Sequence, residues 1–213
     1  MYSNNRQELF PTIARTSPVI FSLLTIINCI VYPSYNSFYI FIMYFATIFS
    51  NTIFKNLIFK PLYKVFNISN NNFLGLGNRP KGANGCAFTL DNKISTSFGM
   101  PSGHSQIAWT VAIYILCRII NNLINNKYSN TNNSIKILNY LWFITSCILI
   151  LWIAFYISYS RVYIEGCHTI QQVIVGGVIG GIGGIIIYYN EYNIKLFVKS
   201  IVKSFAKLFK KLL

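Results

Sequence analysis

The chain has 213 residues, of which 54% are hydrophobic, 16% aromatic and only 10% charged, and its formal net charge is +14. This composition is too apolar for a water-soluble domain of that length and indicates an integral membrane protein. We predict one membrane-embedded, all-helical domain over residues 1–194, followed by a basic tail over residues 195–213.

Five apolar runs are long enough to cross a bilayer, which requires about 17–25 residues. They lie at residues 17–32, 38–59, 105–120, 137–156 and 169–189. The break at residues 33–37, which begins with Pro33, predicts a tight turn between the first two runs. The predicted fold class is therefore all-α: an integral membrane helical bundle with about five spanning helices and a C-terminal amphipathic helix.

A polar segment at residues 77–82 lies between the second and third runs and contains Arg79 and Pro80. An arginine side chain presents a planar fork of donors that matches phosphate oxygens, and a proline fixes the local backbone. Taken alone, this segment is only a weak indication of a phosphate site.

The segment Pro101-Ser102-Gly103-His104 opens the third run. Ser102 suits the N-cap of a helix, and Gly103 allows a ligand to approach the backbone closely. A helix that begins here directs free N–H groups toward an anion such as phosphate, and His104 can take up or release a proton near neutral pH. The alternative is a capped membrane helix with an ordinary histidine in its first turn.

Ser160-Arg161 follows the fourth run, and His168 precedes the fifth. His168 and His104 are the only two histidines of the chain. Ionisable residues at a membrane edge are costly and are candidates for function. Arginine suits phosphate, and a histidine can form a covalent intermediate as a nucleophile. The alternative is a helix-anchoring arginine and a histidine in a loop.

In this order, the three motifs resemble the type 2 phosphatidic acid phosphatase superfamily, which also holds the vanadium haloperoxidases. Its pattern is Lys-x6-Arg-Pro, Pro-Ser-Gly-His and Ser-Arg-x5-His-x3-Asp. Residues 99–106 and 168–173 are most similar to its dolichyl-diphosphatase-like branch, which also carries Gln where most relatives have Asp. The resemblance covers roughly residues 50–180.

The resemblance implies a metal-independent phosphatase without cofactors that hydrolyses lipid phosphate or polyprenyl diphosphate esters through a phosphohistidine. The implied roles are phosphate binding by Arg79, Ser102, Gly103 and Arg161, nucleophilic attack by His168, acid–base catalysis by His104, and orientation of the nucleophile by Gln172. Two alternatives remain open: a lipid phosphotransferase, and a catalytically degenerate membrane protein that binds lipid phosphate.

The motif lysine is absent from its usual spacing, because Asn72 stands seven residues before Arg79. Lys55 and Lys60 both lie in sequence that resembles the usual context of that lysine. Either one fits if an insertion of polar, Asn-rich sequence separates it from Arg79.

Two further departures affect the third motif. Six residues rather than five separate Arg161 from His168, and Gln172 replaces the usual Asp. A neutral amide accepts a hydrogen bond from an imidazole N–H but stabilises an imidazolium less than a carboxylate does. Glu165 is the nearest carboxylate, and we expect it to face water rather than to substitute.

Counting the crossings places Arg79, His104, Arg161 and His168 on one face of the membrane, together with the N-terminus. The other face holds the Asn-rich loop and the tail.

Lysines recur in the tail at every fourth position from Lys195 to Lys211, which predicts a basic amphipathic helix on an anionic leaflet. Its apolar face argues against nucleic-acid binding. The positive-inside rule predicts a cytosolic tail and a lumenal or extracellular active face.

Two smaller patterns involve glycines of the last run and cysteines of the predicted active face. Gly176, Gly180 and Gly184 recur at intervals of four, which predicts close helix packing, more within the bundle than between copies. Cys86 and Cys167 both fall on the predicted active face, where an oxidising lumen would allow a disulfide; two free thiols are the alternative. The lipid, the organelle and the oligomeric state stay open.

Overall fold

The computed structural model describes residues 9–68, 74–83, 97–125 and 133–212. Its elements are α1 (Leu9–Val31), α2 (Tyr35–Ile53), η1 (Phe54–Phe59), α3 (Lys60–Val65), α4 (Gly103–Asn125), α5 (Asn133–Tyr159), η2 (Ser160–Ile164) and α6 (Ile170–Leu212). Within these ranges the β-pairing is a single antiparallel bridge between Asn78 and Phe98. The all-α fold class is confirmed.

Within the described residues, five helical segments are long and apolar enough to cross a membrane, as the sequence predicts. They are Pro11–Val31, Tyr35–Val65, Gly103–Ile124, Tyr140–Ile164 and Ile170–Ile194. Many large apolar side chains on these segments are exposed at the surface of the bundle, which is the expected arrangement for a lipid-facing surface.

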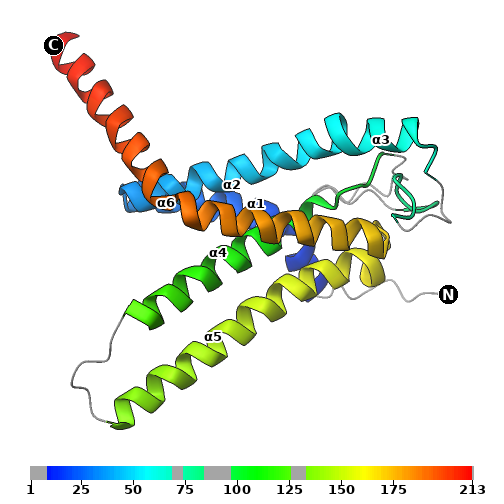
Figure 1. Ribbon diagram of the computed structural model, residues 1–213, viewed down its shortest axis with the longest axis horizontal. Coiled ribbons are helices and arrows are strands. Elements are labelled where there is room, and N and C mark those ends of the chain that lie inside the picture. Colours follow the sequence, from blue (N-terminus) through cyan, green and yellow to red (C-terminus); the bar gives the residue numbers. More distant parts are fainter. Residues whose placement is uncertain (1–8, 69–73, 84–96, 126–132, 213) are drawn as a thin grey trace.

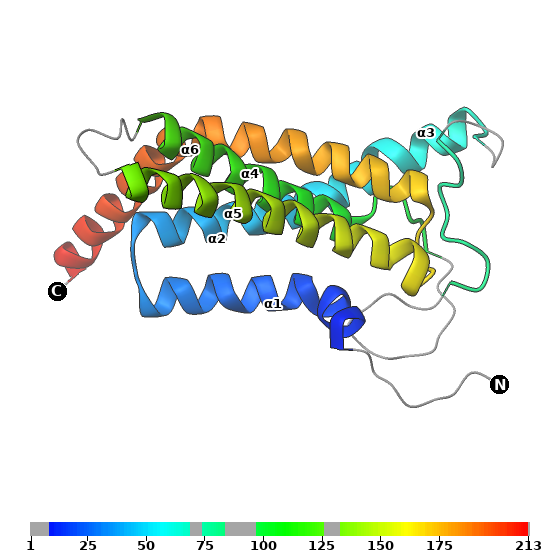
Figure 2. The same ribbon diagram turned by 90° about the horizontal axis from the view of Figure 1, so that it is seen from below.

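Helix α4 lies in the middle of the bundle, against α6, α5 and α2, while α1 packs mainly beside α2 (Figures 1 and 2). The contact between α4 and α6 depends on the glycine stripe. A Cβ atom added at Gly176 would lie 2.5 Å from the carbonyl oxygen of Ser102, and one at Gly184 would lie 2.7 Å from that of Thr110. These backbones can approach only because glycine has no side chain, so the stripe serves packing within the bundle.

Two short π-helices interrupt the regular helices at the same end of the bundle. The segment η1 continues α2 into α3, and η2 extends α5. A π-helical turn accommodates an extra residue in a helix and occurs frequently at functional sites. Figure 2 shows that the starts of α1, α4 and α6 lie at this end, together with α3 and the end of α5. The predicted grouping of motifs at one face is therefore reproduced.

Helix α6 continues without a break to Leu212, and its C-terminal part rises away from the bundle in Figure 1. The side chains beyond Ser200 lie outside the described residues. The amphipathic character of the tail and its contact with a leaflet therefore stay predictions.

Candidate active site

The start of α4 presents a buried serine at the N-cap position. The carbonyl of Ser102 accepts a hydrogen bond from the N–H of Gln106 at 3.0 Å, and its own N–H donates to the carbonyl of Gln172 at 3.0 Å. The hydroxyl of Ser102 is fully buried and has no hydrogen-bond partner among the described residues. Ser102 therefore precedes α4 at the N-cap position, but its side chain does not cap the helix. Its hydroxyl is available to a ligand.

An amide pair fixes α2 against this same point. Asn51 donates from Nδ2 to Oε1 of Gln106 at 2.8 Å, and Gln106 donates from Nε2 to the hydroxyl of Ser50 at 2.9 Å. The side chain of Gln106 is almost completely buried, so both bonds form away from water. These bonds fix the end of α2 against α4 just before η1 begins.

Lys55 lies in η1, about one helical turn beyond Asn51. Its positive charge is one of the influences that lower the pKa of His168, whereas Lys60 is exposed and is not among them. Of the two lysines that the sequence left open, the structure therefore favours Lys55 as the lysine of the site.

The extra residue of the third motif does not separate Arg161 from His168. The N–H of His168 donates to the carbonyl of Arg161 at 3.1 Å. The intervening chain is taken up by the π-helical turn, in which the N–H of Glu165 reaches back to the carbonyl of Ser160 at 2.8 Å. Gly166 then turns the chain with a φ of +61°, a conformation that favours glycine.

Gln172 connects His168 to the segment that carries Arg79. Its Oε1 lies 2.8 Å from Nδ1 of His168, and its Nε2 donates to the carbonyls of Leu76 at 2.9 Å and Asn78 at 2.7 Å. Because both carbonyls can only accept, the amide nitrogen must face them and the amide oxygen must face the imidazole. Nδ1 of His168 therefore carries the proton, and Nε2 keeps its lone pair.

His168 is buried and surrounded by positive charge. Burial lowers its pKa to about 3, with further lowering by the charges of Arg79, Arg161 and Lys55, while the hydrogen bond to Gln172 acts in the opposite direction. The imidazole is thus neutral at physiological pH. A neutral imidazole among cations is suited to attack an electrophile that brings negative charge with it.

Arg79 is held by the segment that precedes the second motif. Its N–H donates to the carbonyl of Ser97 at 3.3 Å, and its Nε donates to the hydroxyl of Ser97 at 3.0 Å. Its Nη1 is buried and has no partner in the described part of the chain. Burial lowers the pKa of Arg79, but a guanidinium remains charged at any physiological pH.

The expectation that Glu165 faces water is wrong. Its side chain is only 4% exposed, and its Oε2 accepts from Nη1 of Arg161 at 2.8 Å and from Nε of Arg15 at 3.3 Å. Glu165 turns inward because the two guanidinium groups supply the charge that a buried carboxylate requires. The motif pattern gave no sign of Arg15, which comes from α1 and lies 150 residues away in the sequence.

His104 also contacts α1. Its Nε2 lies 3.0 Å from the backbone carbonyl of Arg15, which can only accept, so this nitrogen carries a proton. The second residue of α4 is therefore held in place by a helix that lies outside the three sequence motifs.

Cys167 immediately precedes His168, is fully buried and is disulfide-bonded. Three other cysteines, Cys29, Cys117 and Cys147, are free. Cys86 lies outside the described residues, so its pairing with Cys167 stays a prediction.

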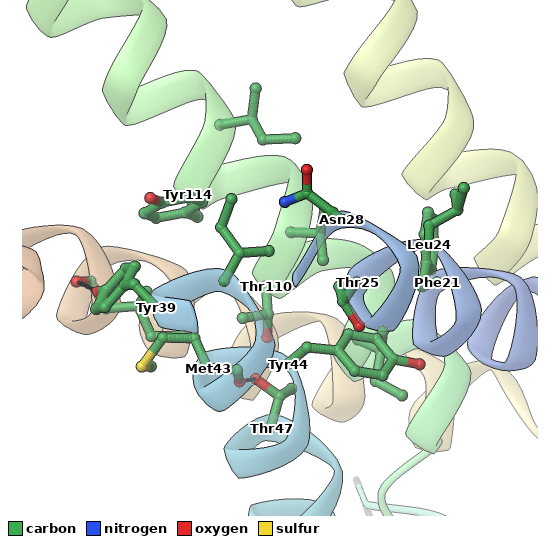
Figure 3. A pocket seen from close by; sticks show the side chains of 15 residues that line it. Phe21, Leu24, Thr25, Asn28, Tyr39, Met43, Tyr44, Thr47, Thr110 and Tyr114 are labelled. Carbon is green, nitrogen blue, oxygen red and sulfur yellow. Dashed lines mark hydrogen bonds between the residues drawn. The ribbon is translucent and has the colours of Figure 1, made fainter. Parts of the chain in front are cut away.

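An apolar cavity of about 390 Å³ lies among α1, α2 and α4 (Figure 3). Its lining includes Phe21 of α1, Thr47 of α2 and Ile107 of α4. Thr47 is one helical turn before Asn51, and Ile107 is about one turn after His104, so one end of the cavity lies about one turn from the start of α4. Ligand cavities commonly measure about 300–1,000 Å³.

The arrangement is suited to an anion. Ser102, the free N–H groups at the start of α4, and the cations Arg79, Arg161 and Lys55 surround the neutral imidazole of His168. Among the described residues, no group of three or more His, Cys, Asp or Glu side chains converges to hold a metal ion.

A family model described as the PAP2 superfamily matches residues 36–195. The chain is 36% identical to Dolichyldiphosphatase 1 of Homo sapiens over 106 residues, which are 49% of this chain and 42% of that protein. It is 35% identical to the protein of that name from Callithrix jacchus over 106 residues, 49% of this chain and 42% of that protein. For Mus musculus the identity is 37% over 89 residues, 42% of this chain and 34% of that protein.

The matched region therefore spans less than half the length of these curated relatives. No solved structure matches the chain. Helix α1, which supplies Arg15, lies before the first residue of the family match.

Proposed function

The chain belongs to the PAP2 superfamily, and we propose that it is a metal-independent membrane phosphatase that hydrolyses lipid phosphate or diphosphate esters. The observation that carries the proposal is the placement of His168, whose Nδ1 is bound to Gln172 while Arg161 and the start of α4 lie beside it. The printed name of the human relative, Dolichyldiphosphatase 1, favours a polyprenyl diphosphate as the substrate.

In the first step, Nε2 of His168 attacks the terminal phosphorus while the bond from that phosphorus to the bridging oxygen breaks. Arg79, Arg161, Lys55 and the amides near Ser102 stabilise the negative charge of the transferred group. His104, as an imidazolium, donates its Nδ1 proton to the bridging oxygen and keeps Nε2–H on the carbonyl of Arg15. The products are a lipid monophosphate and a phosphohistidine.

In the second step, water attacks the phosphohistidine. His104, now neutral with a free lone pair on Nδ1, accepts a proton from the water as the P–N bond breaks. Inorganic phosphate leaves, and both histidines return to their starting states. The phosphorylated His168 carries positive charge on its ring. The amide oxygen of Gln172 stabilises this charge by accepting a hydrogen bond from Nδ1–H.

The apolar cavity supplies a place for the hydrocarbon chain. Its walls come from spanning helices, and one end of it lies about one helical turn from Asn51 on α2 and from His104 on α4. A lipid that lies there with its head group at the start of α4 stays within the bilayer while it reacts.

We further propose that the active end faces the lumen or the exterior and that the tail faces the cytosol. The disulfide at Cys167 supports an oxidising side for the active end. The lysines of the tail support the cytosolic side for the other end.

The proposal is tested with purified protein and a panel of polyprenyl diphosphate, polyprenyl phosphate, phosphatidate and a sphingoid phosphate in a metal-free buffer. We expect inorganic phosphate from the polyprenyl diphosphate at the highest rate. Transfer of labelled phosphate to an added lipid alcohol instead of water would establish a phosphotransferase. Binding of the lipids without any phosphate release would establish a degenerate, non-catalytic protein.

A further inference from the structure

Arg15 reaches the site through two different groups. Its Nε bonds to the carboxylate of Glu165 at 3.3 Å, and its carbonyl lies 3.0 Å from Nε2 of His104. The Arg15 side chain is 30% exposed, whereas that of Glu165 is 4% exposed and that of Arg161 is completely buried. In the described part of the chain, its guanidinium bonds through Nε, which leaves the terminal nitrogens at the accessible edge of the cluster.

The contact with His104 fixes the position of this histidine against α1. The Nε2–H bond is directed at α1, beside Arg15. Because Nε2–H is donated to the carbonyl of Arg15, the nitrogen left to exchange a proton with a leaving oxygen is Nδ1. The bond holds the ring against α1, so a leaving oxygen that reaches His104, as the proposed function requires, lies in the part of the site that α1 borders. A leaving group at this position lies next to the guanidinium of Arg15.

A lipid diphosphate has three parts in a fixed order: the hydrocarbon chain, the leaving phosphate and the attacked phosphate. The structure offers three regions in a corresponding order, namely the apolar cavity, the Arg15 side of His104, and the cluster around His168. The cavity is lined by residues of α1 from Phe21 onward, so the hydrocarbon chain of the lipid and the leaving phosphate would both lie along α1.

We propose that Arg15 binds the leaving phosphate of a lipid diphosphate and makes the site selective for diphosphates over monophosphates. This proposal rests on the proposed function and specifies its substrate class. In a lipid monophosphate the leaving group is an uncharged alcohol oxygen, which gains little from a guanidinium. In a diphosphate the same position carries a phosphate, which a guanidinium binds through charge-assisted hydrogen bonds.

Arg15, the residue proposed to select diphosphates, lies outside the family motifs, because it precedes the matched residues 36–195. The chain also offers a matched control at another position. Arg118 of α4 bonds to Glu191 of α6 at 3.3 Å, the same distance as between Arg15 and Glu165. Replacement of Arg118 removes an equivalent ion pair without touching the proposed leaving-phosphate position.

The test measures the Kd of farnesyl methylenediphosphonate and of farnesyl phosphonate, two ligands that cannot be hydrolysed, for the full chain in detergent micelles. We expect Arg15→Gln to weaken the diphosphonate by about tenfold or more, since a charge-assisted bond contributes roughly 1.5–3 kcal/mol. The Kd of the phosphonate should change by less than about threefold, and Arg118→Gln should leave the ratio of the two Kd values unchanged.

Equal weakening of both ligands by Arg15→Gln would identify a structural role and overturn the proposal, as would no change in either. Arg15→Lys provides a second variant that keeps the charge. Its single ammonium cannot reproduce the fork that serves Glu165 and a phosphate together, so we expect a smaller loss confined to the diphosphonate. If the protein binds the diphosphonate through Arg15 but releases no phosphate from any lipid, the proposed function fails while this inference stands.

Discussion

The amide oxygen of Gln172 lies 2.8 Å from Nδ1 of His168, while the amide nitrogen of the same side chain donates to two backbone carbonyls of the segment before Arg79. A carboxylate cannot make this set of contacts, because it has no hydrogen to donate. The glutamine therefore does more than replace an aspartate: it fixes the tautomer of His168 and ties the Arg79 segment to α6.

Gln172→Glu should impair the protein although it preserves shape. A carboxylate at this position faces the carbonyls of Leu76 and Asn78 at distances where oxygen repels oxygen, and the lost bonds cost about 1–3 kcal/mol. We expect a drop of at least about tenfold in the rate of phosphate release and a lower unfolding temperature. Partial recovery is expected at acidic pH, where the protonated acid can again donate.

Gln171→Glu provides the control, since it makes the same chemical change at the exposed neighbouring position. If Gln172→Glu behaves like this control in both rate and unfolding temperature, the amide nitrogen has no role in the site.

His104→Ala should affect substrates according to their leaving groups. A lipid phosphomonoester has a poor leaving oxygen and depends on a proton, whereas an activated aryl phosphate does not. We expect the rate of phosphate release to fall by roughly 10²–10⁴ for the lipid ester and much less for the aryl ester. Comparable losses on the two substrates would argue against His104 as the general acid.

The stability of the protein should depend on pH through His168. Its pKa is about 3 in the folded chain and 6.5 as an ordinary histidine, so the unfolded chain binds a proton first as the pH falls. Stability is therefore lost between these two values, by at most about 1.4 kcal/mol per pH unit. The unfolding temperature of His168→Asn should fall less steeply from pH 7 to pH 4 than that of the wild type; parallel curves would refute the burial of a neutral His168.

Vanadate should inhibit phosphate release, and chelators should not. Vanadate adopts the trigonal-bipyramidal geometry expected at phosphorus during attack by His168. The chain has only four acidic residues, and a catalytic Mg²⁺ is normally held through carboxylates. Activity is measured with increasing vanadate and, separately, after extensive treatment with EDTA. Loss of activity in EDTA with recovery on addition of Mg²⁺ would contradict the metal-free scheme.

The spanning helices and the order of the motifs could be predicted because they depend on local features of the sequence. Apolar runs of sufficient length determine the former, and Ser102 at the head of such a run identifies the start of α4. The sequence could not show whether Lys55 or Lys60 is the lysine of the site, since both lie in similar sequence. The placement of Lys55 in η1, where its charge acts on His168, is a property of the folded chain.

The contacts of Glu165 and Arg15 could not be predicted for a different reason. A single carboxylate after an apolar run usually faces water, and nothing near Glu165 in the sequence indicates a partner 150 residues away. The inward turn of Glu165 depends on the π-helical turn of η2 and on the packing of α1 against the site, both of which are properties of the folded chain.

Trapping of the covalent intermediate shows whether His168 carries the phosphoryl group. The wild-type protein is mixed with farnesyl diphosphate labelled at its terminal phosphate, quenched within milliseconds, and digested for peptide mapping. We predict a label that is stable in base, labile in acid and located on His168, with His168→Asn remaining unlabelled although it folds. A wild-type protein that releases phosphate without any labelled histidine, or a His168→Asn variant that retains more than about a hundredth of wild-type activity, would contradict the account.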